Sequence, residues 1–498
     1  MSQPKDPFSK LKTLSKEIAL LSSISGLLEW DQETHMPSQA IDMRASQLEL
    51  MAGLIHKHKT SSTFKKTLSE LIDLMATKEH SLEMQAAARE WLKDFLRDSK
   101  LPSSFVKNFS KTTSAALAAW DEAKKTANFH LFLPHLEKIV TLSRKKANLL
   151  EYKEHPYDAL LDLYEPDLTT ATLTTLFEKL KPPLIHILKE TQKKQKKVDL
   201  NLGIFAEDLQ IKTGHLLLRA MGFSKESSRL DTSSHPFCTG LHPKDIRMTT
   251  RIDVKDPSSS IFSVIHEGGH GLYHQNLPEE HFGTPLCEAA SYGVDESQSR
   301  LWETIIGRGF PFWKFFYPKL QELFPDDLST ISLNDFYCWI NRIEPSTIRV
   351  EADEVTYCLH IILRFELEKG LIDGSIQAKD VPTIWNKKME EYLGITPSND
   401  QEGCLQDIHW AMGGIGYFPT YALGNLLAAQ LFESIKLSHP DFKQKIEIGD
   451  FSFLREWLYE NIHKHGKIYP PKELILKASG KPLGVESYIN YLETKFLD

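Results

Sequence analysis

A helical repeat over the first part of the chain constrains its fold most strongly. From Asp6 to about Lys197, apolar residues recur at intervals of three and four, as in the segment FSKLKTLSKEIALLSSISGLLEW, which begins at Phe8. This spacing gathers the apolar side chains on one face of an α-helix. Because strand signals are nearly absent from this region, the sequence predicts a mostly α-helical fold.

One small β element is expected near the middle of the chain. The segment DIRMTTRIDV, from Asp245 to Val254, alternates polar and apolar residues and is rich in Thr, Ile and Val, which favour strands. The turn-forming sequence HPFCTGLHPK precedes it, so we expect a short hairpin or small sheet. Helical patterns resume from Ile261.

The length of the chain predicts two lobes. Its 498 residues exceed the roughly 250 to 300 over which one hydrophobic core grows. We expect an N-terminal helical lobe over approximately residues 1–200 and a second lobe over residues 201–498. Together they form a single unit, because no long linker or low-complexity segment separates them.

Charge, apolar runs and cysteines exclude several functional classes. The net charge of −8 is spread along the chain, so no nucleic-acid partner is expected. No apolar run reaches the roughly 18 residues of a membrane span, and the amino terminus lacks the apolar region of a signal peptide. The five cysteines form no CxxC pair, which indicates a reducing compartment. We expect a cytoplasmic protein without a membrane partner.

The segment SVIHEGGHGLYH, from Ser263 to His274, carries the strongest functional signal. His266 and His270 are four residues apart, so on a helix they face the same way, about 6 Å apart along the axis, and both can bind one Zn²⁺. Glu267 points to the neighbouring side, where it could accept a proton from a water molecule that the metal acidifies. This is the zincin arrangement. The alternative is a helix with two incidental histidines.

Two glycines between the histidines favour the functional interpretation. Gly268 and Gly269 each cost about 1 kcal/mol relative to alanine inside a helix. They are explained if a substrate chain or another backbone must approach this face.

A third metal ligand is expected on a second helix. His274 lies about 12 Å along the axis from His266, too far for one tetrahedral site. In the segment EAASYGVDESQSRLWE, Glu296 is the preferred candidate, since two histidines and one glutamate form a catalytic zinc site with an open position. Three other carboxylates remain possible: Asp295, Glu288 and Glu303.

Several motifs are spread along the chain: LEWDQETHMP, PYDALLDLYEPD, HPF, DIRMT, HEGGH, ESQSRLWE, IRVEAD and GCLQDIHW. Through these motifs the chain resembles, over nearly its whole length, the thermostable carboxypeptidase family, also called the carboxypeptidase Taq type. The resemblance implies a bilobed helical zincin with a deep groove, usually a homodimer, that removes single residues from free carboxyl termini with broad specificity, poorly at proline.

The resemblance also assigns roles to particular residues. It implies that His266, His270 and Glu296 bind one divalent metal, zinc or alternatively cobalt, and that Glu267 is the general base. The family usually has histidine immediately before the glutamate ligand, whereas this sequence has Asp295. This extra carboxylate is expected to affect metal preference or the hydrogen bonds around the ligands.

The resemblance makes Arg349, within IRVEAD, the anchor for the carboxylate of the substrate. The alternative is an ion pair between Arg349 and Glu351 or Asp353. Arg247 is the second candidate anchor, although an ion pair between Asp245 and Arg247 is an equal alternative.

Other polar residues are candidates for contacts with the substrate. His409, Tyr417 and Tyr421 are suited to stabilising an oxyanion, with core packing as the alternative for each. His235 is a further candidate beside the β element. Asp353 and Gln406 are expected to orient their neighbours.

Together these observations predict a metallocarboxypeptidase acting on peptides. The alternative enzyme is an oligopeptidase or dipeptidyl carboxypeptidase on the same fold, which would differ in the distance between the anchor and the metal. The alternative from another class is a catalytically silent, metal-stabilised binding protein.

Overall fold

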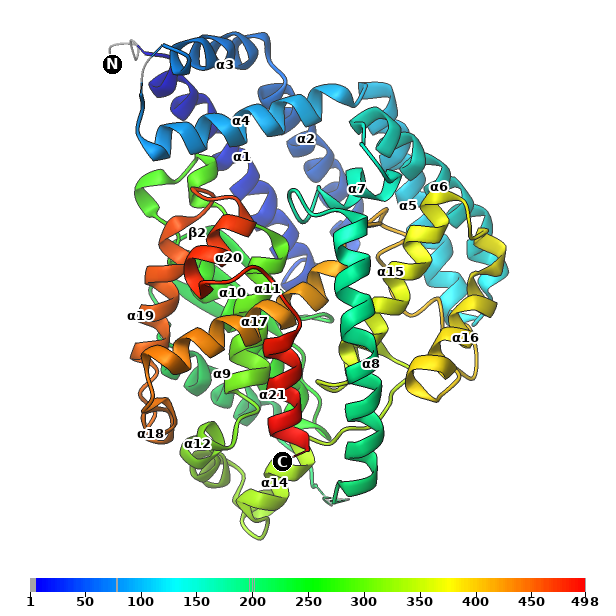
Figure 1. Ribbon diagram of the computed structural model, residues 1–498, viewed down its shortest axis with the longest axis vertical. Coiled ribbons are helices and arrows are strands. Elements are labelled where there is room, and N and C mark those ends of the chain that lie inside the picture. The colour runs from blue at the N-terminus through cyan, green and yellow to red at the C-terminus, as the bar shows by residue number, and fades with distance from the viewer. Residues whose placement is uncertain (1–5, 78, 197, 199, 201, 498) are drawn as a thin grey trace.

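A computed structural model of the chain is mostly helical and contains one small sheet (Figure 1), which confirms the predicted fold class. Two predictions involve residues that the structure does not describe. They are the absence of an apolar run at the amino terminus, of which residues 1–5 are not described, and the end of the helical region at Lys197. The structure describes residues 6–77, 79–196, 198, 200 and 202–497.

The helical repeat of the first 200 residues forms a series of helices, as predicted. Their starts follow local signals, because side chains such as Asp6 and Ser61 accept hydrogen bonds from the first turn. The longest periodic stretch is divided, since Ala127 has a φ of 50° and Asn128 caps a new helix. The helices are α1 (Pro7–Thr34), α2 (Ile41–Lys59), α3 (Ser62–Met75), α4 (Leu82–Lys100), α5 (Ser103–Lys125), α6 (Phe129–Leu150), α7 (Pro156–Leu161) and α8 (Thr170–Lys194).

The remaining helices follow α8 in the chain. One of them, α11 (Tyr292–Arg300), continues directly into a π-helical turn, Leu301–Ile306. Figure 1 shows α10, α11 and α17 near the middle of the molecule, with α3 and α4 at its upper end. The helices are α9 (Glu207–Met221), α10 (Pro257–Gln275), α11 (Tyr292–Arg300), α12 (Phe310–Leu323), α13 (Pro325–Leu328), α14 (Leu333–Ile340), α15 (Tyr357–Asp373), α16 (Val381–Leu393), α17 (Pro419–Ser438), α18 (Phe442–Glu447), α19 (Ser452–Asn461), α20 (Pro471–Ser479) and α21 (Glu486–Phe496).

The β element is a three-stranded sheet of β1 (Ser228–Thr232), β2 (Cys238–His242) and β3 (Asp245–Thr250). Strand β3 is central and pairs antiparallel with β2 and parallel with β1. The predicted small sheet is therefore confirmed, although β3 ends four residues earlier than the alternating pattern and β2 occupies part of HPFCTGLHPK, which was expected to form a turn. Strand β1 was not expected, because its sequence SRLDT contains only one apolar residue.

The hydrophobic core has two parts. The larger part contains buried residues from Ala116 to Leu492 and surrounds α10, α11 and α17. The smaller part lies among α1, α3 and α4 and is joined by Leu286. The core therefore divides within the first 200 residues, and the boundary between two lobes near residue 200 stays a prediction. Among the described residues, no helix is long and apolar enough to cross a membrane.

The glycines of α10 allow close helix packing. A Cβ atom on Gly269 would lie 2.5 Å from Ser299 Cα and 2.6 Å from the carbonyl oxygen of Gln298, both on α11. A Cβ on Gly268 would meet the side chain of Met221 on α9 at 2.6 Å. Of the two alternatives raised by the sequence, a neighbouring backbone is the one that approaches Gly269. This contact brings α10 and α11 together.

We predict that Gly269→Ala lowers the stability of the protein. The added methyl group meets backbone atoms that cannot rotate away, and overpacking of this kind costs about 1–3 kcal/mol. Thermal unfolding measures the effect. The matched control is Gly53→Ala, because Gly53 is also helical and nothing lies within 4 Å of its added Cβ. The control should be neutral or stabilising. Equal melting temperatures for Gly269→Ala and the parent would contradict the close contact.

Candidate active site

Two adjacent helices bring together a group of three potential metal ligands. Helix α10 carries His266 and His270, and α11 carries Glu296. One donor atom from each residue lies within 4.8 Å of the other two. Glu296 Oε2 is 3.4 Å from His270 Nε2 and 3.9 Å from His266 Nε2. A tetrahedral zinc site with bonds of about 2.0–2.1 Å places its ligand atoms roughly 3.4 Å apart, so the three atoms are close to the required spacing.

The other candidate carboxylates have different partners. Glu288 forms an ion pair with Lys467 at 2.5 Å. Glu303 contacts Nδ1 of His266, and Asp295 contacts Nδ1 of His270. His274 Nε2 also lies 3.2 Å from Asp295. Among the described residues, the group that could hold a metal contains none of these four side chains.

A carboxylate orients each of the two histidines. Nδ1 of His266 lies 2.8 Å from Glu303, and Nδ1 of His270 lies 2.9 Å from Asp295. When Nδ1 donates its hydrogen to a carboxylate, the lone pair of Nε2 is left to bind a cation. Both Nε2 atoms are the ones nearest to Glu296. The pattern of hydrogen bonds therefore fits a metal bound through Nε2.

The balance of charge also fits a divalent cation. Four buried or half-buried carboxylates, those of Glu267, Asp295, Glu296 and Glu303, surround the group. Arg300 is the main permanent cation, 2.9 Å from Glu303 and 3.3 Å from Glu296. Because buried carboxylates need compensating charge, a further positive charge would stabilise this arrangement.

Glu267 lies on α10 between the two histidines and is buried. Burial raises the pKa of its carboxyl group, while the charges of His266 and His270 act in the opposite direction. A carboxylate with a raised pKa is a better proton acceptor than an exposed one.

Arg349 is buried and has a partner distant in sequence. Its Nε and Nη2 donate to Asp407 Oδ1 at 3.0 and 2.8 Å, and its Nη1 donates to the Tyr357 hydroxyl at 3.0 Å. The alternative pairing with Glu351 or Asp353 is therefore wrong. A guanidinium has five N–H hydrogens, and these bonds leave one hydrogen on each Nη atom. Arg349 thus keeps two donors.

Asp353 and Gln406 hold the backbone around Arg349. The carboxylate of Asp353 accepts bonds from the backbone N–H groups of Glu344, Val355 and Thr356. Gln406 Oε1 accepts from the backbone N–H of Arg349 at 2.8 Å. These contacts agree with the expectation that both residues orient their neighbours.

A second polar group lies on α17 and the loop before it. The His409 Nε2 atom is 3.1 Å from the Tyr421 hydroxyl. Burial lowers the pKa of His409 to about 4, so its imidazole is neutral at neutral pH. The ring of Tyr421 lies 4.9 Å from the guanidinium carbon of Arg349. Tyr417 packs against Tyr421, and burial raises its pKa.

The two candidates beside the sheet are placed differently. Arg247 pairs with Asp245 at 2.9 and 3.0 Å and lies 4.5 Å above the Trp30 ring. This ion pair was one of the two alternatives from the sequence. His235 is exposed in the loop between β1 and β2.

Three contributors to the site were not foreseen. Arg300 neutralises Glu296 and Glu303, and its position four residues after Glu296 could have indicated this. Asp407 was overlooked beside Gln406 because its partner Arg349 is distant in the sequence. Gly424 on α17 makes room for Glu296, since an added Cβ would lie 2.8 Å from the Cβ of Glu296.

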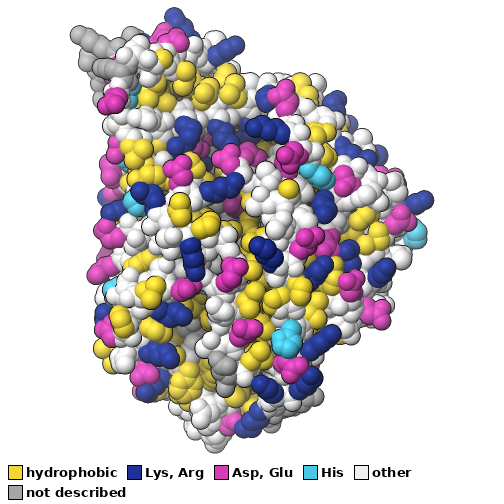
Figure 2. Space-filling model, in the orientation of Figure 1, with side chains coloured by type: hydrophobic (Ala, Val, Ile, Leu, Met, Phe, Trp, Pro, Cys, Tyr) yellow, Lys and Arg dark blue, Asp and Glu magenta, His cyan; other side chains and the backbone are white. Residues whose placement is uncertain are grey.

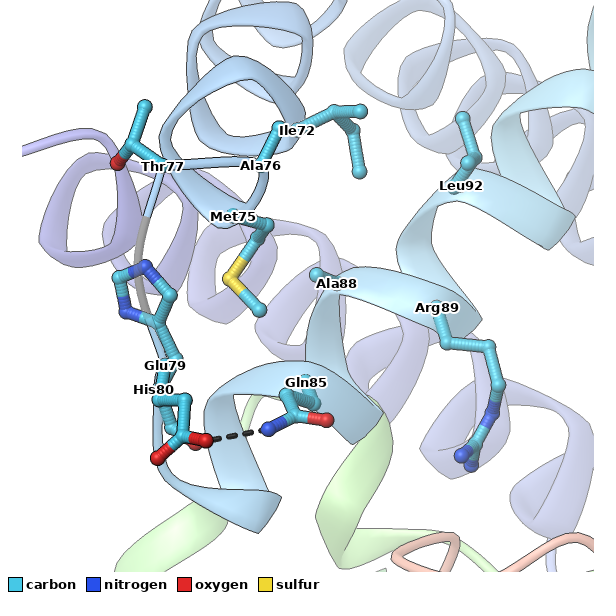
Figure 3. A pocket seen from close by; sticks show the side chains of 10 residues that line it. All are labelled: Ile72, Met75, Ala76, Thr77, Glu79, His80, Gln85, Ala88, Arg89 and Leu92. Carbon is cyan, nitrogen blue, oxygen red and sulfur yellow. Dashed lines mark hydrogen bonds between the residues drawn. The ribbon is translucent and has the colours of Figure 1, made fainter.

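A separate surface pocket of about 670 Å³ lies between α3 and α4. Figure 3 shows some of the side chains that line it, such as Met75, His80 and Arg89. It shares no lining residue with the group of potential metal ligands. The face drawn in Figure 2 mixes basic and acidic side chains, in keeping with the spread of charge along the sequence.

The fold and the site define a class of protein. A helical molecule with a small sheet beside a His-Glu-x-x-His helix, and with a glutamate on the next helix close to both histidines, is a zincin-type metallopeptidase.

The chain belongs to the carboxypeptidase Taq (M32) metallopeptidase family, whose family model matches residues 10–496. It is 40% identical over 487 residues to carboxypeptidase 1 of Bacillus subtilis, covering 97% of this chain and 96% of that protein. It is also 40% identical to thermostable carboxypeptidase 1 of Pyrococcus furiosus, covering 97% of each.

Solved structures of similar proteins agree with this membership. Metallocarboxypeptidase 1 of Trypanosoma cruzi superposes with a TM-score of 0.95 at 34% identity, covering 99% of both chains. The M32 carboxypeptidase of Deinococcus radiodurans gives a TM-score of 0.95 at 33% identity, covering 98% of both. The protein is a metal-dependent carboxypeptidase.

Proposed function

We propose that the protein removes single residues from the free carboxyl termini of peptides, with broad specificity and poor activity at proline. The most direct support is the group of His266, His270 and Glu296, which lies beside Glu267. The buried Arg349 is connected to this group through Tyr357 and Arg300. Arg300 contacts Glu296 and stacks 4.0 Å from the Tyr357 ring, whose hydroxyl accepts a bond from Arg349.

We propose that His266, His270 and Glu296 hold one divalent metal, zinc or alternatively cobalt. When bound, such an ion acts as a Lewis acid that acidifies water and polarises a carbonyl group. Glu267 accepts the proton of the attacking water and delivers it to the leaving amine. Its burial between the two histidines supports this role, because burial raises the pKa of the carboxyl group and so makes the carboxylate a stronger base.

The hydroxyl of Tyr421 is the proposed donor to the oxyanion, with Tyr417 beside it. His409 is neutral and 3.1 Å from Tyr421, so it can fix the direction in which this hydroxyl points. Donors that are already oriented stabilise developing charge without reorganising. His235 remains a candidate for contact with the substrate.

Arg349 is the proposed anchor for the terminal carboxylate. Two of its hydrogens remain for a ligand, and a guanidinium can give a carboxylate two parallel bonds. Arg247 is the second candidate; its Nε and Nη2 donate to Asp245, and its guanidinium carbon lies 4.5 Å from the centre of the Trp30 ring.

A pair of peptides tests the proposal. The metal-loaded enzyme is incubated with one peptide bearing a free carboxyl terminus and with its amidated form, and the products are followed by mass spectrometry. We expect a ladder of single-residue losses from the free peptide and protection of the amide. Losses of two residues, internal cuts, or equal cleavage of both peptides would contradict carboxypeptidase action by single residues.

We predict that Arg349→Met lowers kcat/KM for the free peptide by tens to thousands of fold. Losing one partner of a buried charged pair costs roughly 2–5 kcal/mol, and 1.4 kcal/mol is tenfold. Asp407 retains Arg364 at 2.6 Å, so the fold should persist, as checked by circular dichroism. The control is Arg342→Met, because Arg342 is half exposed on the same segment. A loss below tenfold would remove Arg349 as the anchor.

We also propose a cytoplasmic homodimer. The five cysteines are all free thiols, which supports a reducing compartment. On α1 and α2, the exposed apolar side chains of Leu20, Ile24, Met43 and Leu50 support an interface between copies. Analytical ultracentrifugation measures the mass in solution.

A further inference from the structure

One carboxylate on α11 joins two histidines of α10. Asp295 Oδ1 is 2.9 Å from His270 Nδ1, and Asp295 Oδ2 is 3.2 Å from His274 Nε2. Each oxygen therefore has its own imidazole.

The surroundings hold this arrangement in place. The side chains of Asp295, His270 and His274 are 20%, 17% and 22% exposed, so water competes little for their hydrogen bonds. A Cβ atom on Gly240 of β2 would lie 2.8 Å from both Cβ and Nδ1 of His274. A glycine at this position of the strand thus leaves His274 the space to reach Asp295.

His266, the other histidine of the proposed metal site, also contacts a carboxylate that has a second partner. Glu303 contacts His266 at 2.8 Å and is itself paired with Arg300 at 2.9 Å. Each metal-facing histidine therefore has a carboxylate, and each carboxylate has a second partner that fixes its direction. On the His266 side that partner is an arginine, and on the His270 side it is His274.

We propose that Asp295, held in place by His274, is a positioning residue that directs His270 Nε2 toward the metal and increases the affinity of the site. This rests on the proposed role of His270 as a ligand. His274 acts only through Asp295, because it is not among the residues that could hold the metal. The two residues form one unit, so removing both should cost no more than removing Asp295 alone.

The test measures metal binding directly. Metal-free parent and variants are titrated with Zn²⁺ against a chromophoric chelator, and with Co²⁺ while the visible absorption spectrum is recorded. We expect Asp295→Ala to raise the Kd for Zn²⁺ by about 10- to 100-fold and to alter the Co²⁺ spectrum. Asp295→Asn should lose less, because its amide oxygen still accepts from His270 and its amide nitrogen can donate to His274.

A double variant tests the coupling. His274→Ala should raise the Kd less than Asp295→Ala, and the variant with both changes should match Asp295→Ala. The control is Glu288→Ala, which removes a carboxylate near the start of α11 that pairs with Lys467 and should bind Zn²⁺ like the parent.

The outcomes are distinct. Parent-like Zn²⁺ affinity and Co²⁺ spectra for both Asp295 variants would overturn the inference, as would a double variant in which the two losses add. If Asp295→Ala fails to fold by circular dichroism, Asp295→Asn and His274→Ala decide the question. If His270→Ala keeps the metal of the parent, the proposed metal site itself is wrong. If His270→Ala loses the metal while Asp295→Ala does not, only the role of Asp295 is rejected.

Discussion

Glu267→Gln should leave the metal content of the protein unchanged and lower kcat by about 10²–10⁴-fold, the contribution typical of a positioned general base. Glutamine keeps the size of the side chain and its place between the two histidines, so the group of ligands is undisturbed. Its amide cannot accept a proton at neutral pH. The substitution therefore separates the proton transfer from the binding of the metal and of the peptide.

Steady-state kinetics on a peptide with a free carboxyl terminus give kcat, and elemental analysis of the same preparation gives the metal content. Glu226→Gln is a matched control, since Glu226 is exposed, and it should behave as the parent. Wild-type turnover in Glu267→Gln would reject the general base. Loss of metal would instead mean that Glu267 contributes to binding the ion.

His270→Ala should lose the metal and the activity together. The change removes one of the three donor atoms that lie within 4.8 Å of one another, and two ligands hold zinc poorly. It also leaves Asp295 without its partner at 2.9 Å. We expect no detectable metal after dialysis and no cleavage above background.

The metal also stabilises the protein that binds it, so added zinc should raise the melting temperature of the parent but not of His270→Ala. His186→Ala is the control, because His186 is exposed on α8 and should retain both metal and activity. A metal content equal to the parent would remove His270 from the site.

Local patterns in the sequence predicted most of the helices and the central strand of the sheet. The intervals of three and four predicted the helices, because packing of an apolar face depends on nearby residues. The alternation after Asp245 predicted β3 for the same reason. Strand β1 was not predicted, because its residues pair with residues 18 positions further along the chain, as Ser228 does with Ile246. Its own composition also does not favour a strand.

Within the site, the spacing of His266 and His270 was readable because a helix fixes both side chains. Glu296 could only be chosen from several acidic residues, since its position depends on how α11 crosses α10. The partner of Arg349 could not be predicted from the sequence. Asp407 is 58 residues further along the chain, whereas Glu351 and Asp353 are close in sequence and were considered instead.

The glycine at position 424 has a consequence for how the protein matures. Because α17 packs directly against Glu296 at this point, one side of the proposed metal site is formed by a segment more than 100 residues after the proposed ligands. Contacts of such sequence separation form slowly, and a metal site is rarely preformed in an unfolded chain. We therefore expect that a nascent chain that has not yet emerged as far as α17 holds zinc weakly, so that metal uptake marks the completion of folding.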